Sequence, residues 1–389
     1  MLSQPVRAGL ELGAALIPAP EKTNWQDESV IAVVDQLLGD AIEKKVSDIH
    51  IEPYEQGSRI RYRRDGLLCE AALLPAHLSV RIITRLKIMA NLNIAERRLP
   101  QDGRLTLLTR LPKTTPLDIR VNTCPTLHGE KMVLRLLDTA TIRLTIGALG
   151  MNEKQSALFL ASLARPQGLI LVTGPTGSGK TVTLYSALQQ VNQLEKNIST
   201  VEDPVEIELH GINQININPK IGLDFAAVLR ALLRQDPDIL MVGEIRDLET
   251  ATIVLQAAQT GHLVLSTLHA NSAAATLLRL QTMGVATDQL MGAISLIIAQ
   301  RLLRQLCQHC KQPAPFALEG CTYQGYAPVG CERCYQGYRG RTGIFELLPV
   351  TNRKKESGPM LWEAGLEKVQ HGMTSYAELI RVMGEADYG

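Results

Sequence analysis

Residues 168–181 decide the fold, and they read Gly168-Leu-Ile-Leu-Val-Thr173 followed by Gly174-Pro-Thr-Gly-Ser-Gly-Lys-Thr181. The first six are an apolar run of strand length, and the next eight match the pattern GxxxxGK followed by Ser or Thr. A helix-capable segment comes next, as the motif requires. Glycines let a backbone wrap closely around phosphates, and N–H groups at a helix N-terminus attract anions. The stretch therefore predicts a strand, a phosphate-binding loop and a helix in succession, which a chance glycine-rich turn would not provide.

Each position of this loop has a predicted part in binding ATP together with Mg²⁺. Lys180 is expected to reach the terminal phosphates, and the Thr181 hydroxyl is the expected Mg²⁺ ligand. The backbone of the other loop residues is expected to surround the phosphates. The full predicted nucleotide-binding set is Gly174, Pro175, Thr176, Gly177, Ser178, Gly179, Lys180 and Thr181.

Two other predicted strands end in a carboxylate. Residues 238–244 read Asp-Ile-Leu-Met-Val-Gly-Glu, and we expect this strand to lie beside the phosphate-loop strand. Glu244 can then hold the water shell of Mg²⁺ or orient the attacking water. Residues 200–206, Thr-Val-Glu-Asp-Pro-Val-Glu, offer Glu202 for the same task. The division of these roles between Glu202 and Glu244 stays open, and a solvated strand end is the alternative for each acid.

A histidine follows another predicted strand. Residues 263–267 read Leu-Val-Leu-Ser-Thr and lead directly into Leu268 and His269. Ligands of open α/β sheets bind at the carboxyl ends of the strands, so His269 can sense the terminal phosphate. A purely structural histidine is an equally good interpretation of this spacing.

Four of the seven cysteines form two CxxC pairs with 20 residues between them. Thiolates at positions i and i+3 of a tight turn can converge on one ion, and two such turns complete a tetrahedron. The predicted ligands of a structural Zn²⁺ are Cys307, Cys310, Cys331 and Cys334. His309 could replace one of them, but the symmetric set of four cysteines is simpler.

The number and spacing of the cysteines also indicate the redox compartment of the protein. An odd number of cysteines with a metal-type spacing favours a reduced, cytoplasmic chain over a disulfide framework. We expect Cys321 to be free and Cys69 and Cys124 to be ordinary small apolar residues. No apolar run approaches the roughly 18 residues that span a bilayer, and the N-terminus has no secretory signal pattern.

Two patterns of secondary structure follow one another along the chain. The first is α+β: predicted helices at 27–44 and 77–95, and strands at 47–52, 59–63, 67–74, 104–111, 117–122 and 131–136, with a hairpin turn at Asp65-Gly66. The second alternates apolar strands, at 169–173, 197–201, 239–242 and 263–267, with helical segments. Continuous apolar strands that alternate with helices predict a parallel sheet covered on both faces.

The changes in secondary-structure pattern and composition along the chain give the predicted domain boundaries. They are a tail or vestigial N-terminus at 1–25, a smaller α+β domain at 26–145, the P-loop core at 146–306, a four-cysteine element at 307–345 and a C-terminal helical segment at 346–389. The helices of that last segment are expected at 360–370 and 375–384.

Charge and composition exclude some function classes. The chain has 40 Lys and Arg against 39 Asp and Glu, for a net charge of +1, and only 4% aromatic residues. This balance disfavours a protein that coats DNA, and the scarcity of rings disfavours base stacking, so we expect no specific nucleic-acid partner. Arg59, Arg61, Arg63 and Arg64 are expected to form a basic strand edge, which is either solvated or in contact with acidic lipid headgroups.

Together these motifs resemble the secretion ATPases of type II secretion and type IV pilus assembly. Residues 200–209 (TVEDPVEIEL) resemble the family's Asp box, residues 243–247 (GEIRD) its Walker B segment, and residues 260–269 (TGHLVLSTLH) its His box. The resemblance implies a PAS-like α+β N-terminal domain, then a RecA-like P-loop ATPase domain with a zinc-binding insert and C-terminal helices. The four-cysteine insert is similar to that of assembly-direction members.

The resemblance also implies roles for arginines. Residues 118–120 (DIR) and 133–135 (VLR) match the family's smaller domain, so Arg120 and Arg135 are expected to reach the phosphates as arginine fingers. Arg suits this role because its fixed fork of donors meets spread phosphoryl charge; strand-surface salt bridges are the alternative. Four more arginines match the family without a catalytic assignment: Arg230, Arg234, Arg246 and Arg279.

The resemblance finally implies partners. The expected protein is an ATPase that forms a homohexamer and works a platform protein at the inner membrane, where it is peripheral. Only about 25 residues precede the smaller domain, so the family's N-terminal docking domain is expected to be absent or vestigial. A DNA-uptake or nucleic-acid traffic ATPase is the alternative enzyme, and a nucleotide-binding assembly scaffold with little turnover is the non-enzymatic alternative. The choice between pilus and pseudopilus stays open.

Overall fold

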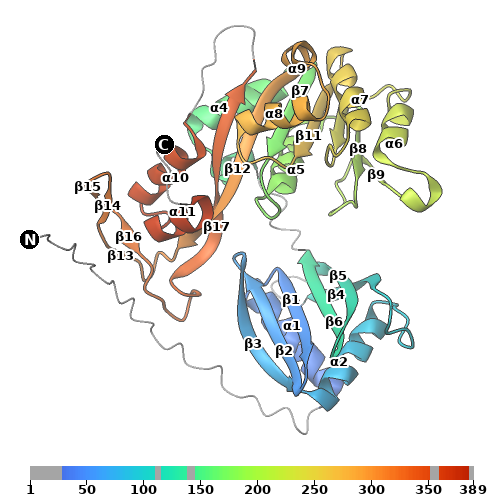
Figure 1. The fold of residues 1–389 in the computed structure, drawn as a ribbon, viewed down its shortest axis with the longest axis vertical. Coiled ribbons are helices and arrows are strands. Elements are labelled where there is room, and N and C mark those ends of the chain that lie inside the picture. The colour runs from blue at the N-terminus through green and yellow to red at the C-terminus, as the bar shows by residue number, and fades with distance from the viewer. Residues whose placement is uncertain (1–28, 110–114, 138–144, 351–358, 385–389) are drawn as a thin grey trace, which may run out of the picture. The chain divides into compact units, whose positions relative to one another are not determined.

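The computed structural model describes residues 29–109, 115–137, 145–350 and 359–384. The predicted tail and the end of the predicted strand 104–111 lie outside these residues. Contacts divide the chain into two compact units (Figure 1). The first consists of Met1–Leu107 and Asp118–Leu136, and the second of Leu108–Leu117 and Leu137–Gly389.

The first unit is a six-stranded sheet with two helices on one face. Its strands run in the order β3-β2-β1-β6-β5-β4. The hydroxyl of Tyr62 on β2 donates to the carbonyl of Leu37 on α1, and Ser58 on the same face of β2 contacts Ser79 on α2. The bounds are α1 (Val30–Glu43), β1 (Asp48–Tyr54), β2 (Gly57–Arg64), β3 (Leu67–Pro75), α2 (Ala76–Met89), β4 (Gln101–Thr109), β5 (Thr115–Thr126) and β6 (Gly129–Leu137).

The arginines of β2 do not form a sheet edge, so that prediction was wrong. β2 lies between β3 and β1, and its side chains alternate between the two faces of the sheet. On the face without helices, Arg59 and Arg61 pair with Glu52, and Arg63 pairs with Asp48. Cross-strand pairs of opposite charge are favourable in antiparallel sheets, and here they neutralise much of the basic strand.

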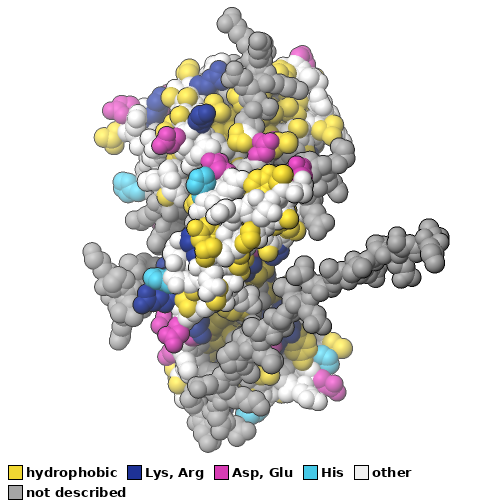
Figure 2. All heavy atoms as spheres, turned by 90° about the vertical axis from the view of Figure 1, so that its left-hand side faces the viewer, with side chains coloured by type: hydrophobic (Ala, Val, Ile, Leu, Met, Phe, Trp, Pro, Cys, Tyr) yellow, Lys and Arg dark blue, Asp and Glu magenta, His cyan; other side chains and the backbone are white. Residues whose placement is uncertain are grey.

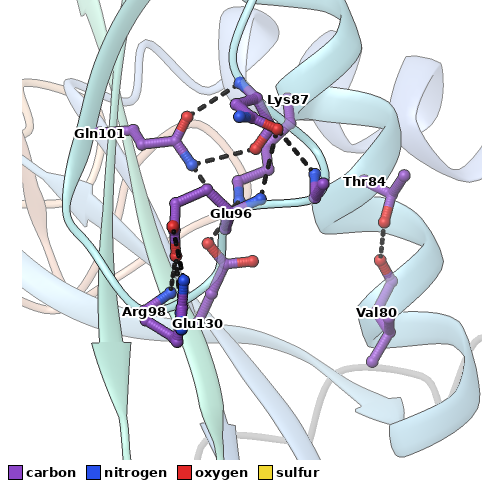
Figure 3. Close-up of polar contacts among 9 residues, drawn as sticks. Val80, Thr84, Lys87, Glu96, Arg98, Gln101 and Glu130 are labelled. Carbon is purple, nitrogen blue, oxygen red and sulfur yellow. Dashed lines mark hydrogen bonds and ion pairs between the residues drawn. The ribbon is translucent and has the colours of Figure 1, made fainter.

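The predicted helix 77–95 ends earlier, at Met89. Ala90 caps it, and Asn91 has a φ of 56°, so the chain leaves the helix in a left-handed residue. Lys87 lies in the last turn and is 1% exposed. Its ammonium donates to Glu130 at 2.5 Å and to the Glu96 carbonyl at 2.7 Å, which ties the loop after α2 to β6 (Figure 3).

The second unit is built on a seven-stranded sheet in the order β17-β12-β7-β11-β10-β8-β9. The six strands from β12 to β9 pair in parallel, and β17 pairs antiparallel to β12. The strands are β7 (Gly168–Thr173), β8 (Ile198–Glu202), β9 (Asn213–Asn216), β10 (Ile239–Val242), β11 (Leu263–Leu268), β12 (Ile294–Leu306) and β17 (Tyr338–Pro349). This arrangement confirms the predicted parallel sheet.

Helices cover both faces of this sheet, because alternate residues of each buried strand point to opposite sides. Leu169 and Leu171 belong to the core cluster that includes residues of α6 to α11, whereas Ile170 and Val172 belong to the cluster that includes residues of α4 and α5 (Figure 1). The helices are η2 (Ile146–Leu149), α4 (Glu153–Leu163), α5 (Lys180–Val191), η3 (Pro219–Ile221), α6 (Phe225–Leu232), α7 (Leu248–Gln259), α8 (Ala273–Thr282), α9 (Thr287–Ala293), α10 (Leu361–Gln370) and α11 (Tyr376–Met383).

Two long strands of this sheet were not predicted. The run Ile294–Leu306 is almost wholly apolar, and periodicity cannot distinguish a buried strand from a buried helix in such a run. Residues 338–345 were placed in the four-cysteine element, but they belong to β17 and pair with β12. Between these strands lie four short ones: β13 (Gln312–Pro313), β14 (Phe316–Leu318), β15 (Cys321–Tyr323) and β16 (Tyr326–Ala327).

Candidate nucleotide-binding site and metal centre

Four parallel strands of the second unit end at the same edge of its sheet. Thr173 at the end of β7 lies opposite Leu268 at the end of β11, and Val242 of β10 lies opposite Val201 of β8. The phosphate loop, His269, Glu244 and Glu202 follow or form these ends. Ligands of parallel sheets bind at this edge, so the topology brings the predicted motifs together.

One neighbour relation was predicted wrongly. The neighbours of β7 are β12 on one side and β11, which leads into His269, on the other; β10, which leads into Glu244, is one strand further away. A continuous apolar strand fits any interior position of a parallel sheet, so its sequence does not specify its neighbour. The inserted strand places His269 between the phosphate loop and Glu244 in the order of the strand ends.

The phosphate loop is packed against Gln300 in the middle of β12. Gly174 has a φ of 152°, and a Cβ atom there would lie 2.5 Å from the carbonyl oxygen of Gln300. Gly179 caps α5 with a φ of 90°, and its Cβ would lie 2.8 Å from Nε2 of Gln300. Both positions therefore require glycine, and the first turn of α5, with Lys180 and Thr181, follows at once.

The Lys180 ammonium lies inside this loop. It donates to the carbonyl oxygens of Gly174 at 2.9 Å and Pro175 at 3.1 Å. Burial lowers its pKa, Glu244 opposes that shift and Arg301 adds to it. An anion within the loop favours the charged ammonium, so phosphate binding and lysine protonation reinforce one another.

Glu244 is in contact with the side chains of Arg246 and His269. Arg246 forms an ion pair with it and also donates to Asp203 at 3.2 Å. His269 Nε2 lies 3.6 Å from the other Glu244 oxygen. Burial lowers the pKa of His269, as does the charge of Lys180, which favours the neutral ring. Arg246, which had no predicted catalytic role, is therefore part of this site.

Glu202 is in a different environment from Glu244. Its side chain is buried, and it accepts hydrogen bonds from Tyr185 at 2.5 Å, Thr200 at 2.7 Å and Gln214 at 3.1 Å. Burial raises the pKa of Tyr185, which keeps the phenol protonated as a donor. These contacts tie the helix after the phosphate loop to β8 and β9, whereas the Glu244 side chain is 21% exposed.

Sequence reasoning missed the residues that support the loop from β12 and β7. Gln300 is 2% exposed and accepts a hydrogen bond from Thr183 at 2.7 Å. The Thr173 hydroxyl donates to the Leu268 carbonyl at 2.9 Å and accepts from the Ala270 N–H, which fixes the segment that carries His269. A polar residue inside a long apolar run was the one available signal for Gln300.

The two predicted finger arginines lie in the first unit, Arg120 on β5 and Arg135 on β6. Arg135 donates through Nε to Asp48 at 3.0 Å. The contacts of Arg120 and Arg135 with phosphates stay predictions.

The four predicted zinc ligands converge. Their sulfur atoms all lie within 4.8 Å of one another, and three of the Sγ–Sγ distances are 3.7–3.8 Å. A tetrahedron with Zn–S bonds of about 2.3 Å has edges of roughly 3.8 Å, so the cluster fits Zn²⁺. The amides of Gly330 and Cys331 donate to the sulfurs of Cys310 and Cys334, and such hydrogen bonds orient thiolate ligands toward a metal.

The other cysteines are outside this cluster. Cys321 is exposed, in agreement with a free thiol. Cys124 is also exposed and Cys69 is half-buried, and neither of these two, which are expected to be ordinary small apolar residues, is in the cluster. His309 is exposed beside Arg333 and is not among the clustered ligands.

A phosphate loop between β7 and α5, with an acid at the end of a parallel strand two positions away, defines a RecA-like P-loop ATPase core. The chain belongs to the family described as type II/IV secretion system protein, whose model matches residues 23–381. The protein is therefore a motor ATPase of the secretion and pilus-assembly class that uses a nucleotide with Mg²⁺.

Curated relatives and a solved structure agree with this assignment. The chain is 50% identical to the type IV pilus assembly ATPase PilB of Pseudomonas aeruginosa, over 96% of this chain and 71% of the relative. It is 47% identical to type II secretion system protein E of Dickeya dadantii, over 92% and 76%. The pilus retraction motor PilT with bound ADP matches with a TM-score of 0.60 and 25% identity, over 91% of this chain and 97% of PilT.

Two further features of the molecule concern membrane-spanning helices and the charge of one face. Among the described residues, no helix is both long enough and apolar enough to cross a membrane. Figure 2 shows the face that carries the C-terminal helices, where acidic, basic and hydrophobic side chains are mixed rather than gathered by sign.

Proposed function

We propose that this ATPase powers assembly of a type IV pilus or a type II secretion pseudopilus through a platform protein of the inner membrane. The observation that carries the proposal is the arrangement of Lys180, Glu244 and His269 around one sheet edge, in a chain 50% identical to a pilus assembly ATPase. The four-cysteine cluster agrees with an assembly-direction motor, as the family resemblance implies.

The catalytic assignment gives each side chain one task. Lys180 binds the terminal phosphates, and the Thr181 hydroxyl would ligate Mg²⁺, which neutralises charge on the β- and γ-phosphates. Glu244 orients the attacking water, since its carboxylate is partly exposed and lies 3.6 Å from the His269 ring. His269, with its lowered pKa, donates one hydrogen bond to the terminal phosphate from its N–H as a neutral ring.

Glu202 then has a supporting task. Three hydrogen-bond donors engage both oxygens of its buried carboxylate, so it holds α5 and the strand edge in place rather than presenting an oxygen to water. This proposal divides the roles that the sequence left open. The remaining groups act between subunits: Arg120 and Arg135 reach the phosphates in a homohexameric ring, and stabilise the transition-state charge.

The four cysteines hold a structural Zn²⁺ in this proposal. Cys307 directly follows β12, and its N–H donates to the carbonyl of Gly337, the residue before β17. The ion therefore closes the end of the β12–β17 pair. Four protein ligands leave no open position, so the metal has no part in hydrolysis.

ATP turnover in two variants tests the catalytic assignment. Lys180→Ala should abolish tight nucleotide binding, and Glu244→Gln should lower kcat by about 100-fold or more while ATP still binds. A Glu249→Gln variant is the matched control, because this exposed acid on α7 pairs only with the exposed Arg230 among the described residues. Undiminished turnover in both Lys180→Ala and Glu244→Gln would sink the assignment.

Recovery from membranes tests the partner. The Glu244→Gln protein, held with ATP, should co-purify with a polytopic platform protein encoded beside pilin or pseudopilin genes. Steep, salt-sensitive stimulation of turnover by single-stranded DNA, without any such partner, would instead favour the nucleic-acid motor.

A further inference from the structure

One buried acid lies between two arginines on the charged face of the first sheet. Asp48 of β1 is directly opposite Arg135 of β6 on one side and Arg63 of β2 on the other. Residues opposite one another on adjacent antiparallel strands are close enough for their side chains to interact. The register of three strands therefore brings both arginines to one carboxylate.

The two oxygens of Asp48 have separate partners. Oδ1 accepts a hydrogen bond from Arg135 Nε at 3.0 Å, and Oδ2 accepts one from the Ser47 hydroxyl at 2.8 Å. Arg63 Nε lies 3.6 Å from Oδ2. The Asp48 side chain is 8% exposed, whereas that of Arg135 is 59% exposed. The acid is therefore fixed within the sheet surface, and the arginine extends outward from it.

A second acid on the same strand holds its arginine in another way. Glu52 accepts from both Nε and Nη2 of Arg61, each at 2.8 Å, and Arg59 and Lys131 also pair with it. That two-point contact engages the end of the Arg61 fork. Arg135, by contrast, is held at Nε alone, and among the described residues its two Nη groups have no acceptor.

We propose that Asp48 is a positioning residue for Arg135, which it holds at Nε so that both Nη groups are presented to the phosphates of ATP. This inference rests on the proposed role of Arg135 as an arginine finger. A guanidinium offers five N–H donors in a rigid plane. A hydrogen bond at Nε orients this plane and leaves the four N–H donors of the two Nη groups available to phosphate oxygens. Correct orientation of reacting groups before the reaction accelerates it. Asp48 acts through Arg135 and does not touch the nucleotide.

The test compares Asp48→Asn with Glu52→Gln in the full-length protein. Both acids are buried on one strand and each faces arginines, so both substitutions should lower the melting temperature. Asp48→Asn should also lower kcat by about 10- to 100-fold, whereas Glu52→Gln should leave kcat near that of the parent. Asp48→Glu keeps the carboxylate and should recover most of the turnover.

A double variant separates positioning from general damage. Arg135→Ala should lower kcat on the order of 1000-fold, and adding Asp48→Asn to it should change kcat no further. Independent, multiplicative losses would overturn the proposal, and so would an equal loss of kcat in Glu52→Gln.

A direct measurement distinguishes this inference from the proposed role of Arg135. The Nε–H of Arg135 should give a slowly exchanging NMR signal that persists in Glu52→Gln and is lost in Asp48→Asn. If that signal is unchanged in Asp48→Asn, Asp48 does not hold Arg135, whatever the turnover. If the signal behaves as expected but Arg135→Ala retains full turnover, the arginine-finger role fails and the contact with Asp48 is structural.

Discussion

The phenol of Tyr185, on the helix that follows the phosphate loop, donates a 2.5 Å hydrogen bond to the buried carboxylate of Glu202. The same hydroxyl accepts from the Glu206 N–H at 3.2 Å. Tyr185 thus joins α5 to Glu202 at the end of β8 and to the segment that follows it. This contact supports the proposal that Glu202 has a structural role and that Glu244 orients the attacking water.

Removing that phenol should destabilise the fold more than it affects chemistry. Tyr185→Phe leaves the Glu202 carboxylate buried with one donor fewer, which should cost about 1–3 kcal/mol of unfolding free energy. Chemical denaturation measures this cost, and kcat measured well below the unfolding transition should stay within a few fold of the parent. A collapse of kcat without loss of stability would place Glu202 and Tyr185 in the reaction itself.

Replacing Lys87 should lower the free energy of unfolding because it leaves the buried carboxylate of Glu130 without its cationic partner. Lys87→Met removes the ammonium that lies 2.5 Å from Glu130, whose side chain is 8% exposed. Removing one partner of a buried pair typically costs roughly 3–5 kcal/mol. The variant also lacks the hydrogen bond from Lys87 to the Glu96 carbonyl in the region that Figure 3 shows. Denaturant titration should show this loss, and the double variant Lys87→Met with Glu130→Leu should be less destabilised than Lys87→Met alone. The opposite order would mean that the pair itself stabilises little.

Mildly acidic pH should destabilise the first unit through His50. Burial lowers the pKa of this imidazole, and Arg63 and Lys131 lower it further against the opposing charges of Asp48 and Glu52. The unfolded ring has a pKa near 6.5, so below that value the unfolded state binds more protons than the folded state. Stability is therefore complete above pH 6.5 and falls as the pH drops through the lowered folded value.

A His50→Asn variant isolates that contribution. Its unfolding free energy should depend less on pH between about 7.5 and 5 than that of the parent, because asparagine does not titrate. Other groups also change the unfolding free energy with pH, including thiolates that gain protons. Their contributions are common to both proteins and cancel when the two unfolding free energies are subtracted. Parallel pH profiles of the two proteins would contradict the assigned pKa direction.

The cysteine cluster should bind one Zn²⁺ per chain. Elemental analysis of the purified protein should give this ratio, and Cys331→Ser should reduce it while Cys321→Ser does not, since Cys321 is outside the cluster. A strong chelator should lower the melting temperature by several degrees, because metal binding free energy contributes to folding. A full complement of zinc in Cys331→Ser would show that the metal is held elsewhere.

The sequence by itself determined the chemistry of the nucleotide site and of the metal cluster. Both depend on short motifs whose residues are close along the chain: the loop that ends in Lys180 and Thr181, and the two CxxC turns. The spacing of such motifs already imposes their geometry, since a turn or a helix start brings the groups together locally. The alternation of strands and helices likewise indicated a parallel sheet.

Only the tertiary structure decided how distant segments meet. The insertion of β11 between β7 and β10, the pairing of β17 with β12 and the support of the phosphate loop by Gln300 all join residues far apart in sequence. The sequence of an apolar strand does not specify which strands lie beside it, because burial on both faces is compatible with any interior position of the sheet. The different environments of Glu202 and Glu244, alike in sequence as acids at strand ends, arise from those neighbours.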